Sequence, residues 1–134
     1  MIDNHFTATG IVFNSKNEIL MIHHNKFQVW LPPGGHVEEN ELPADAVIRE
    51  IIEETGVDAI IIPNNKGLEL TSEYCKELEL PFAMFMEDIN SDGTHNHIDM
   101  YFLCRAITTD ITPLACPPPL TLVTGGGSDF HNKW

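Results

Sequence analysis

The segment from Pro33 to Val57 reads PGGHVEENELPADAVIREIIEETGV and concentrates seven acidic side chains around one arginine. A proline near its middle and a glycine near its end predict a helix from about Leu42 to Thr55. At about 100° per residue, one arc of this helix is apolar and the other is acidic. The apolar arc comprises Ala44, Val47, Ile48, Ile51 and Ile52. We therefore expect a fold in which the helix packs on a sheet and presents carboxylates on its other side.

The acidic arc consists of Glu50, Glu53 and Glu54, at positions i, i+3 and i+4. Such carboxylates repel one another in a bare helix, whereas Mg²⁺ and Mn²⁺ prefer clustered oxygen ligands of this kind. A solvated acidic helix face is the alternative interpretation. Arg49 lies beside the cluster, and we expect it to pair with an acid such as Glu41 and so hold the preceding loop against the helix.

The spacing of the whole segment is more specific than the glutamates alone. Five residues separate Gly35 from Glu41, and seven separate Glu41 from the pair Arg49-Glu50. Two isoleucines, Glu53-Glu54, a threonine, Gly56 and an apolar residue complete the pattern. Every position of the Nudix box is thereby filled from Gly35 to Val57, and the chain resembles a Nudix hydrolase. The flanking strand pattern and the stretch WLPPGG extend the resemblance to roughly residues 5–106.

The resemblance implies an α/β fold, an α/β/α sandwich around a mixed sheet. It implies metal-dependent hydrolysis of a diphosphate bond in a nucleoside diphosphate linked to another group, X. The implied ligands of Mg²⁺ or Mn²⁺ are Glu50, Glu53, Glu54 and the Gly34 carbonyl. The implied catalytic residues are Glu53 as general base, Glu50 and Arg49. The implied structural residues of the box are Gly35, Glu41 and Gly56.

Residues outside the box leave two questions open. The general base could instead be an acid on a later loop, with Glu87, Asp88 and Asp92 as candidates. The substrate is a small nucleotide, either a nucleoside triphosphate, an ADP-ribose-like molecule or a dinucleoside polyphosphate. Candidates for contacting it are Trp30, Lys26, Tyr74 and Tyr101.

The length of the chain suits one domain, predicted over residues 1–106. Strands are expected at 6–24 around a turn at Asn14–Asn17, at 27–31, 57–62 and 68–74, and in a hairpin over 80–107. The segment 107–134 contains Pro-Pro-Pro and Gly-Gly-Gly, so we expect irregular structure there in place of a closing helix. One face of the sheet would then lack its usual cover, and a partner subunit in a homodimer could supply it.

Charge and cysteine content narrow the function classes. A net charge of −13 argues against non-specific nucleic-acid binding and against binding to an anionic membrane. No apolar run approaches the roughly 18 residues of a membrane span. Three cysteines without CxxC spacing argue against a disulfide framework, so we expect a cytoplasmic protein.

Three other functions are considered. Asp88–Asp99 resembles an EF-hand calcium loop, although its flanks alternate like strands. His95, His97 and Asp99 suggest zinc, against the simpler interpretation of a polar strand face. A Nudix-like domain could also bind nucleotides as a sensor without hydrolysing them, but such domains often lose box residues, and all are present here.

Overall fold

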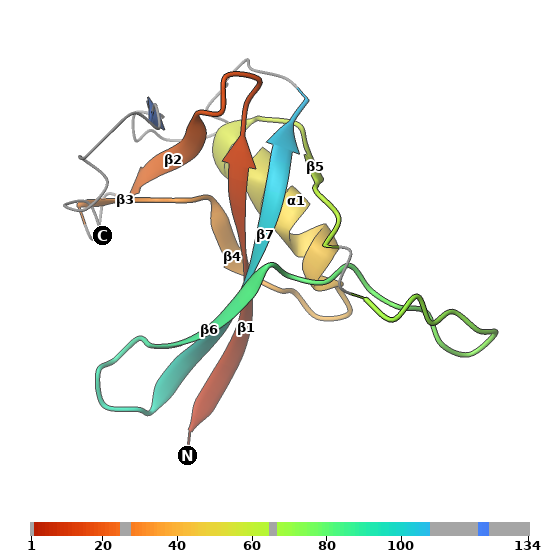
Figure 1. Cartoon of the computed structure of the whole chain (residues 1–134). Coiled ribbons are helices and arrows are strands. Elements are labelled where there is room, and N and C mark those ends of the chain that lie inside the picture. The colour runs from red at the N-terminus through yellow and green to blue at the C-terminus, as the bar shows by residue number, and fades with distance from the viewer. Residues whose placement is uncertain (1, 25–27, 65–66, 108–120, 124–134) are drawn as a thin grey trace.

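Two long parallel strands form the centre of the fold. The computed structural model describes residues 2–24, 28–64, 67–107 and 121–123. Strand β1 (Asp3–Phe13) pairs with β7 (His95–Ala106) along its whole length, from Asp3 opposite His95 to Phe13 opposite Arg105. Figure 1 shows these strands side by side, crossing the molecule from the N-terminus upwards.

Shorter strands extend this pair into a mixed sheet. Within the described residues the path of the sheet is β3-β2-β1-β7-β5, while β4 pairs with β1, β6 with β7 and β8 with β2. The bounds are β2 Ile19–His24, β3 Val29–Leu31, β4 Gly34–His36, β5 Ala59–Ile61, β6 Ala83–Asp88 and β8 Thr121–Val123. The sheet pairs β4 directly with β1, and this places the start of the box in the centre of the fold.

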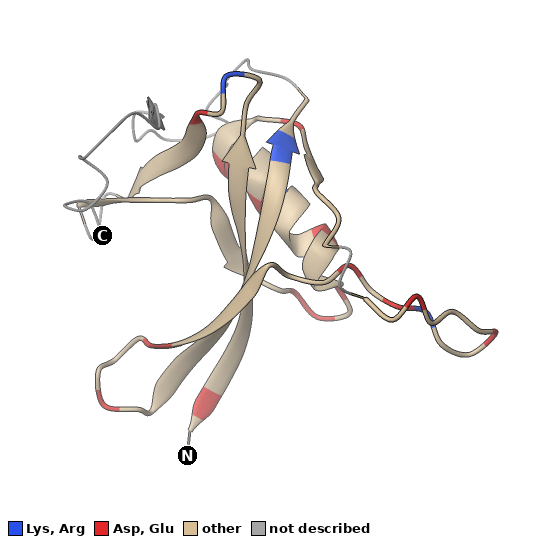
Figure 2. Ribbon diagram, in the orientation of Figure 1, with Lys and Arg blue, Asp and Glu red and all other residues tan. Residues whose placement is uncertain are grey.

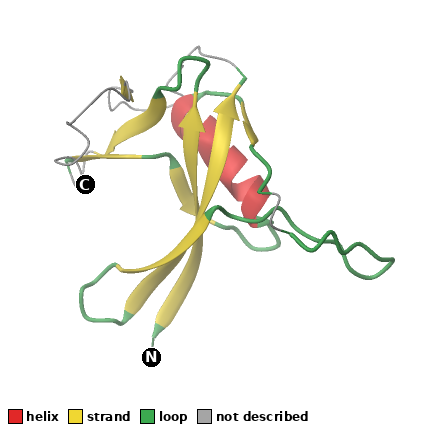
Figure 3. Ribbon diagram, viewed as in Figure 1, coloured by secondary structure: helices red, strands yellow, loops and turns green. Residues whose placement is uncertain are grey.

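Helix α1 (Pro43–Thr55) covers one face of the sheet, and it is the one helix among the described residues (Figure 3). Pro43 occupies its first turn, and Gly56 ends it with a left-handed φ of 70°, a conformation that glycine adopts at low cost. Val47 and Ile51 are fully buried. They join the core with residues of alternate positions on β1 and β7: Ala8, Val12, Met100, Phe102 and Cys104. The predicted apolar arc is therefore confirmed at Val47 and Ile51. Ala44 and Ile48 pack against the core partly buried, whereas Ile52 lines a hollow at the surface with Asp45 and Glu53.

The sheet extends beyond the helix. The first half of β1, the start of β7 and β6 form a ribbon that projects away from α1 in Figure 1. Several of its apolar side chains are exposed, among them Phe6, Met84 and Met86. By register these side chains lie on the face of the sheet that carries α1, because Met84 pairs with the core residue Met100 and Phe6 pairs with Ile98. They do not mark the uncovered face that a homodimer was expected to cover, and dimerisation stays a prediction.

Most of the strands expected from sequence are present, and one expectation needs correction. Leu68–Tyr74 is not a strand, since this segment contributes only the isolated bridge between Thr71 and Lys76. Its alternation of apolar and polar residues has no neighbouring strand to pair with, and Leu68 and Leu70 are exposed. The two strands expected around Asn14–Asn17 are confirmed: β1 and β2 are antiparallel and pair at Phe13 and Ile19, and the Asn14 N–H donates to the Glu18 carbonyl at 3.1 Å.

The predicted irregular segment 107–134 lies mostly outside the described residues. Three of its residues form β8, which pairs with β2 from Ile19–Val123 to Met21–Thr121. The division at residue 106 stays a prediction.

Among the described residues no helix has the length and hydropathy needed to cross a bilayer. Cys75 and Cys104 are free thiols.

Candidate active site

Arg49 organises the acidic side of the helix. Its Nε and Nη2 atoms donate to the two oxygens of Glu41, at 2.8 and 3.0 Å. Its Nη1 atom donates to Glu50 Oε1 at 2.8 Å and to Glu53 Oε2 at 3.1 Å. Nη2 also donates to the His36 carbonyl at 3.0 Å. One guanidinium thus joins the loop before α1, strand β4 and two carboxylates of the predicted metal cluster.

We expect Arg49→Ala to destabilise the chain and to slow any reaction at this site. The substitution removes the shared partner of three carboxylates and frees the loop, which should cost about 1–3 kcal/mol of unfolding free energy. A loop released by this change should also lower turnover on the order of 10-fold. Thermal melts and kinetics of the variant test both effects. Arg49→Lys is the control, because it keeps the charge but loses the fork that binds Glu41 through two bonds. Unaltered melting and turnover in Arg49→Ala would show that the network is incidental.

Glu54 is half-buried and faces strand β4. Its Oε2 atom accepts a hydrogen bond from the Gly34 N–H at 2.9 Å. Burial, together with the charges of Glu50 and Glu53, raises the pKa of Glu54 to about 7, although the Gly34 bond lowers it. The simple solvated-face interpretation is therefore wrong for this residue. A cation here would offset the charges of Glu50 and Glu53, which contribute to the raised pKa of Glu54.

Strand β4 approaches the cluster closely because it consists largely of glycine. A Cβ atom on Gly35 would lie 2.4 Å from Glu50 Oε1, so a larger residue would displace that carboxylate. The Pro33 carbonyl accepts from the Gly10 N–H at 2.8 Å, whereas the next N–H, that of Gly34, turns to Glu54. Because both peptide groups of one strand residue face the same way, the Gly34 carbonyl also faces away from β1. This orientation is compatible with the ligand role expected for it.

A second group of polar side chains lies on the sheet face opposite the core. Asp99 is 5% exposed, and both of its oxygens lie within 3.0 Å of Thr9 Oγ1. Thr7 Oγ1 is buried without a hydrogen-bond partner within the described part of the chain. Burial and the charges of Asp99 and Glu87 raise the pKa of Tyr101 to about 12. These groups are able to form hydrogen bonds with polar atoms of a bound ligand.

The other candidates for substrate contact are placed differently. Trp30 pairs with His23 across β2 and β3, with ring centroids 5.1 Å apart. Tyr74 is 91% exposed in the long loop between β5 and β6, which projects from the body in Figure 1. Lys26 lies outside the described residues. Tyr101 shares a face with the buried polar residues Thr9 and Asp99.

The EF-hand interpretation of Asp88–Asp99 is wrong. Strands β6 and β7 flank this segment, whereas an EF-hand needs two helices. Asp88 accepts from the Gly93 N–H and Asp92 from the Thr94 N–H, so these carboxylates stabilise a hairpin turn. Asp99 lies within β7 and faces Thr9. Two of the alternative general bases, Asp88 and Asp92, thus already serve the turn.

Sequence reasoning missed the residues that β1 contributes. Thr7 and Thr9 were assigned only to a strand, and Asp3 and His5 were not considered. The available signal was alternation: polar residues recur at every second position of β1, as they do at His97, Asp99 and Tyr101 of β7. Finding the connection also required the parallel pairing of two strands from opposite ends of the domain.

Charge is distributed unevenly around these groups. Figure 2 shows acidic residues along α1 and on the loops around it, with few basic residues in the described chain. The chain carries seven lysines and arginines against twenty aspartates and glutamates. An anionic substrate therefore needs cations to approach the carboxylate cluster.

The fold and this cluster define a domain in which one helix presents acidic ligands beside a glycine-rich strand of a mixed sheet. Comparison with known proteins supports the resemblance to Nudix proteins that the sequence showed. The family model of the NUDIX domain matches residues 3–117. The chain belongs to the Nudix family.

Several relatives resemble parts of the chain. A Lactococcus lactis protein, "Probable DHNTP pyrophosphohydrolase", is 31% identical over 75% of this chain and 54% of its own length. The zebrafish 8-oxo-dGDP phosphatase NUDT18 is 41% identical over 40% of this chain and 17% of its own. The chain thus spans about half or less of the length of these curated relatives. A NUDIX hydrolase structure from Clostridium perfringens is 29% identical, with a TM-score of 0.73 over 90% of this chain and 81% of that one.

Proposed function

We propose that the chain hydrolyses a diphosphate bond in a nucleoside diphosphate linked to another group, using Mg²⁺ or Mn²⁺. The observation that carries this proposal is that Glu50, Glu53 and the half-buried Glu54 lie on one side of α1 beside the glycines of β4. Arg49 bonds Glu50 and Glu53, and the Gly34 N–H bonds Glu54. A divalent cation would offset the negative charge that Arg49 leaves on this side of the helix.

The donor set fits a hard divalent cation. All side-chain donors are carboxylate oxygens, which Mg²⁺ prefers over nitrogen or sulfur ligands. Arg49 uses one oxygen of Glu50 and one of Glu53, and Gly34 uses one of Glu54. The second oxygen of each carboxylate lies outside these bonds, so the three residues and the Gly34 carbonyl would hold the metal. When bound, it neutralises phosphate charge and acidifies a water molecule.

The chain's own residues position the reaction. Arg49 fixes the loop and orients Glu50 and Glu53, which reduces the freedom of the reacting groups. Glu53 is 59% exposed at its side chain, so its carboxylate can reach a water molecule and take its proton. We therefore assign it as general base, with Glu87 as the remaining alternative on β6.

The substrate class is a small nucleotide. The relatives' names include a pyrophosphohydrolase of DHNTP and a phosphatase of 8-oxo-dGDP, both of which act on phosphoanhydrides. Candidates are nucleoside triphosphates, ADP-ribose-like molecules and dinucleoside polyphosphates. The polar groups of Asp99, Thr9 and Tyr101 are our candidates for binding the base or the sugar of the nucleotide.

A substrate screen tests the proposal. The chain is incubated with nucleoside triphosphates, ADP-ribose, dinucleoside polyphosphates and nucleotide sugars, with Mg²⁺ or Mn²⁺, and products are separated by chromatography. We expect cation-dependent cleavage that rises at alkaline pH and stops in excess EDTA. Binding without turnover across the screen would favour the sensor alternative. Undiminished turnover in EDTA would contradict the metal-dependent mechanism.

A further inference from the structure

A group of histidines lies away from the box glutamates, on the polar face of the sheet. His5 on β1, His36 on β4, and His95 and His97 on β7 form a chain of ring contacts. Neighbouring ring centroids lie 4.8–5.3 Å apart. The parallel register explains the gathering, because Asp3 lies opposite His95 and His5 lies opposite His97.

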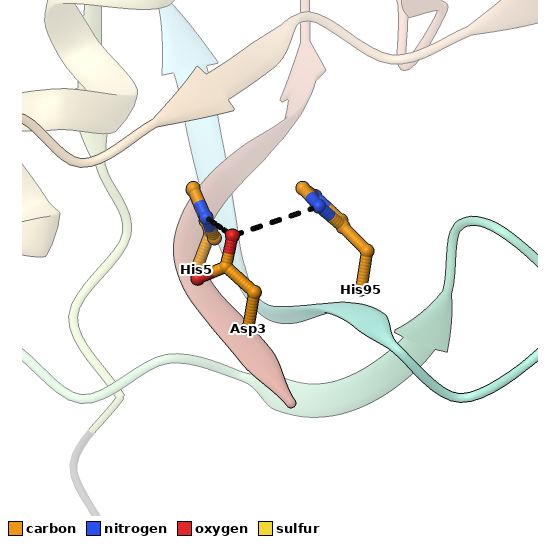
Figure 4. Close-up of side chains that lie close together, drawn as sticks. All are labelled: Asp3, His5 and His95. Carbon is orange, nitrogen blue, oxygen red and sulfur yellow. Dashed lines mark ion pairs between the residues drawn. The ribbon is translucent and has the colours of Figure 1, made fainter. Parts of the chain in front are cut away.

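Asp3 completes one end of this group. Its Oδ2 atom is 2.8 Å from His5 Nε2 and 3.9 Å from His95 Nδ1. One ligand atom from each of the three residues lies within 4.8 Å of the other two. Figure 4 shows the Asp3 carboxylate linked to both imidazoles, whose rings are stacked with centroids 4.8 Å apart.

We propose that Asp3, His5 and His95 form a binding site for a late first-row transition metal, represented by Zn²⁺. Imidazole nitrogen and carboxylate oxygen are suitable Zn²⁺ ligands, with bonds of about 2.0–2.1 Å. A tetrahedral ion with such bonds separates its ligand atoms by about 3.3 Å. The two separations from Asp3 bracket this value, and the stacked imidazoles would have to rotate to direct both nitrogens at one ion. A water molecule would complete the four ligands.

The neighbouring imidazole of His97 supports this arrangement. His95 Nε2 lies 3.3 Å from His97 Nε2, so one of the two nitrogens donates to the other. When His95 Nε2 carries the proton, its Nδ1 lone pair is directed toward Asp3. A hydrogen bond on the far nitrogen commonly fixes the tautomer of a metal-binding histidine in this manner.

A surface ion pair is the simpler explanation of the Asp3–His5 contact, but it leaves the other imidazoles unexplained. The four imidazoles gather from three strands, and a cation shared by Asp3, His5 and His95 is compatible with this packing. The site differs from the box in donor chemistry, because nitrogen ligands favour Zn²⁺ over Mg²⁺.

Zinc titration tests this inference. The chain is prepared without a histidine tag, stripped with EDTA, dialysed, and titrated with Zn²⁺ by calorimetry in excess Mg²⁺ to occupy the carboxylate cluster. We expect one equivalent to bind, with affinity reduced at least about 10-fold in His5→Ala and in His95→Ala. Replacement of Zn²⁺ by Co²⁺ should give visible absorption typical of a low-coordinate site with nitrogen ligands.

Two controls locate the zinc. His23→Ala removes an imidazole of β2 and should leave zinc affinity unchanged, as should Glu54→Gln in the box. Loss of zinc binding in Glu54→Gln with retention in both histidine variants would overturn the proposal. Failure of the parent chain to bind one equivalent would also overturn it. The cobalt absorption is measured on the parent chain. It therefore tests the site even if His5→Ala or His95→Ala fails to fold.

Discussion

Glu50→Gln and Glu54→Gln should each lower metal-dependent hydrolysis by at least about 100-fold while the chain stays folded. Each variant keeps the size of the side chain and its helix propensity but loses one ligand charge. A ligand to a catalytic metal contributes several kcal/mol to the transition state, which corresponds to this loss of rate. Steady-state kinetics on the best substrate, with saturating Mg²⁺, measure the effect. Glu39→Gln removes the same charge from an exposed loop residue and should retain turnover.

Glu54→Gln should lower activity but raise the thermal stability of the metal-free chain. The usual glutamate pKa is 4.5, and that of folded Glu54 is about 7. The folded state therefore binds this proton more tightly, and its contribution to stability is present below pH 4.5 and lost as pH rises to about 7. Glutamine does not titrate and can still accept the Gly34 N–H. In EDTA above pH 7, the variant should melt at a higher temperature than the parent.

The advantage of Glu54→Gln should shrink as pH falls from 7 toward 4.5, because the parent carboxyl then becomes neutral. Added Mg²⁺ should stabilise the parent more than either variant. Near-normal turnover in both variants would mean that the glutamates are only a solvated, charged face of the helix. That result would contradict the proposed hydrolysis.

Val47→Asp should prevent the chain from folding. Val47 is fully buried between α1 and the sheet, within the cluster that contains Ile51 and Phe102. An unpaired carboxylate there costs several kcal/mol, against a total unfolding free energy of about 5–15 kcal/mol for a typical domain. Circular dichroism and thermal melts should show loss of the cooperative transition.

The matched control for this substitution is Val29→Asp. Val29 lies on β3 and is 43% exposed, so its new carboxylate keeps contact with water. We expect a loss of about 1 kcal/mol or less, set by strand propensity. Comparable unfolding in both variants would mean that burial against α1 is not what makes Val47 essential.

The helix and its chemistry could be predicted because both depend on residues close together in sequence. Periodicity identified the face of Val47 and Ile51, and the spacing of the box identified the pairing of Arg49 with Glu41. The hydrogen bond between the Gly34 N–H and Glu54 could not be predicted, since it depends on where β4 passes the helix. The Thr9–Asp99 contact and the histidine group depend on strand register between segments about 90 positions apart, which no local pattern contains.

The parallel pairing of β1 with β7 also sets an order of assembly during synthesis. Paired residues of these strands lie 92 positions apart, and the box is made between them. At about 5–20 residues per second, β1 waits roughly 5–20 s for its partner. Strand β4 can meet it earlier, but the opposite edge stays open to other chains throughout that interval. Translation speed through residues 14–94 should therefore influence the yield of folded protein, because long-range strand pairing is slow and leaves edges prone to aggregation.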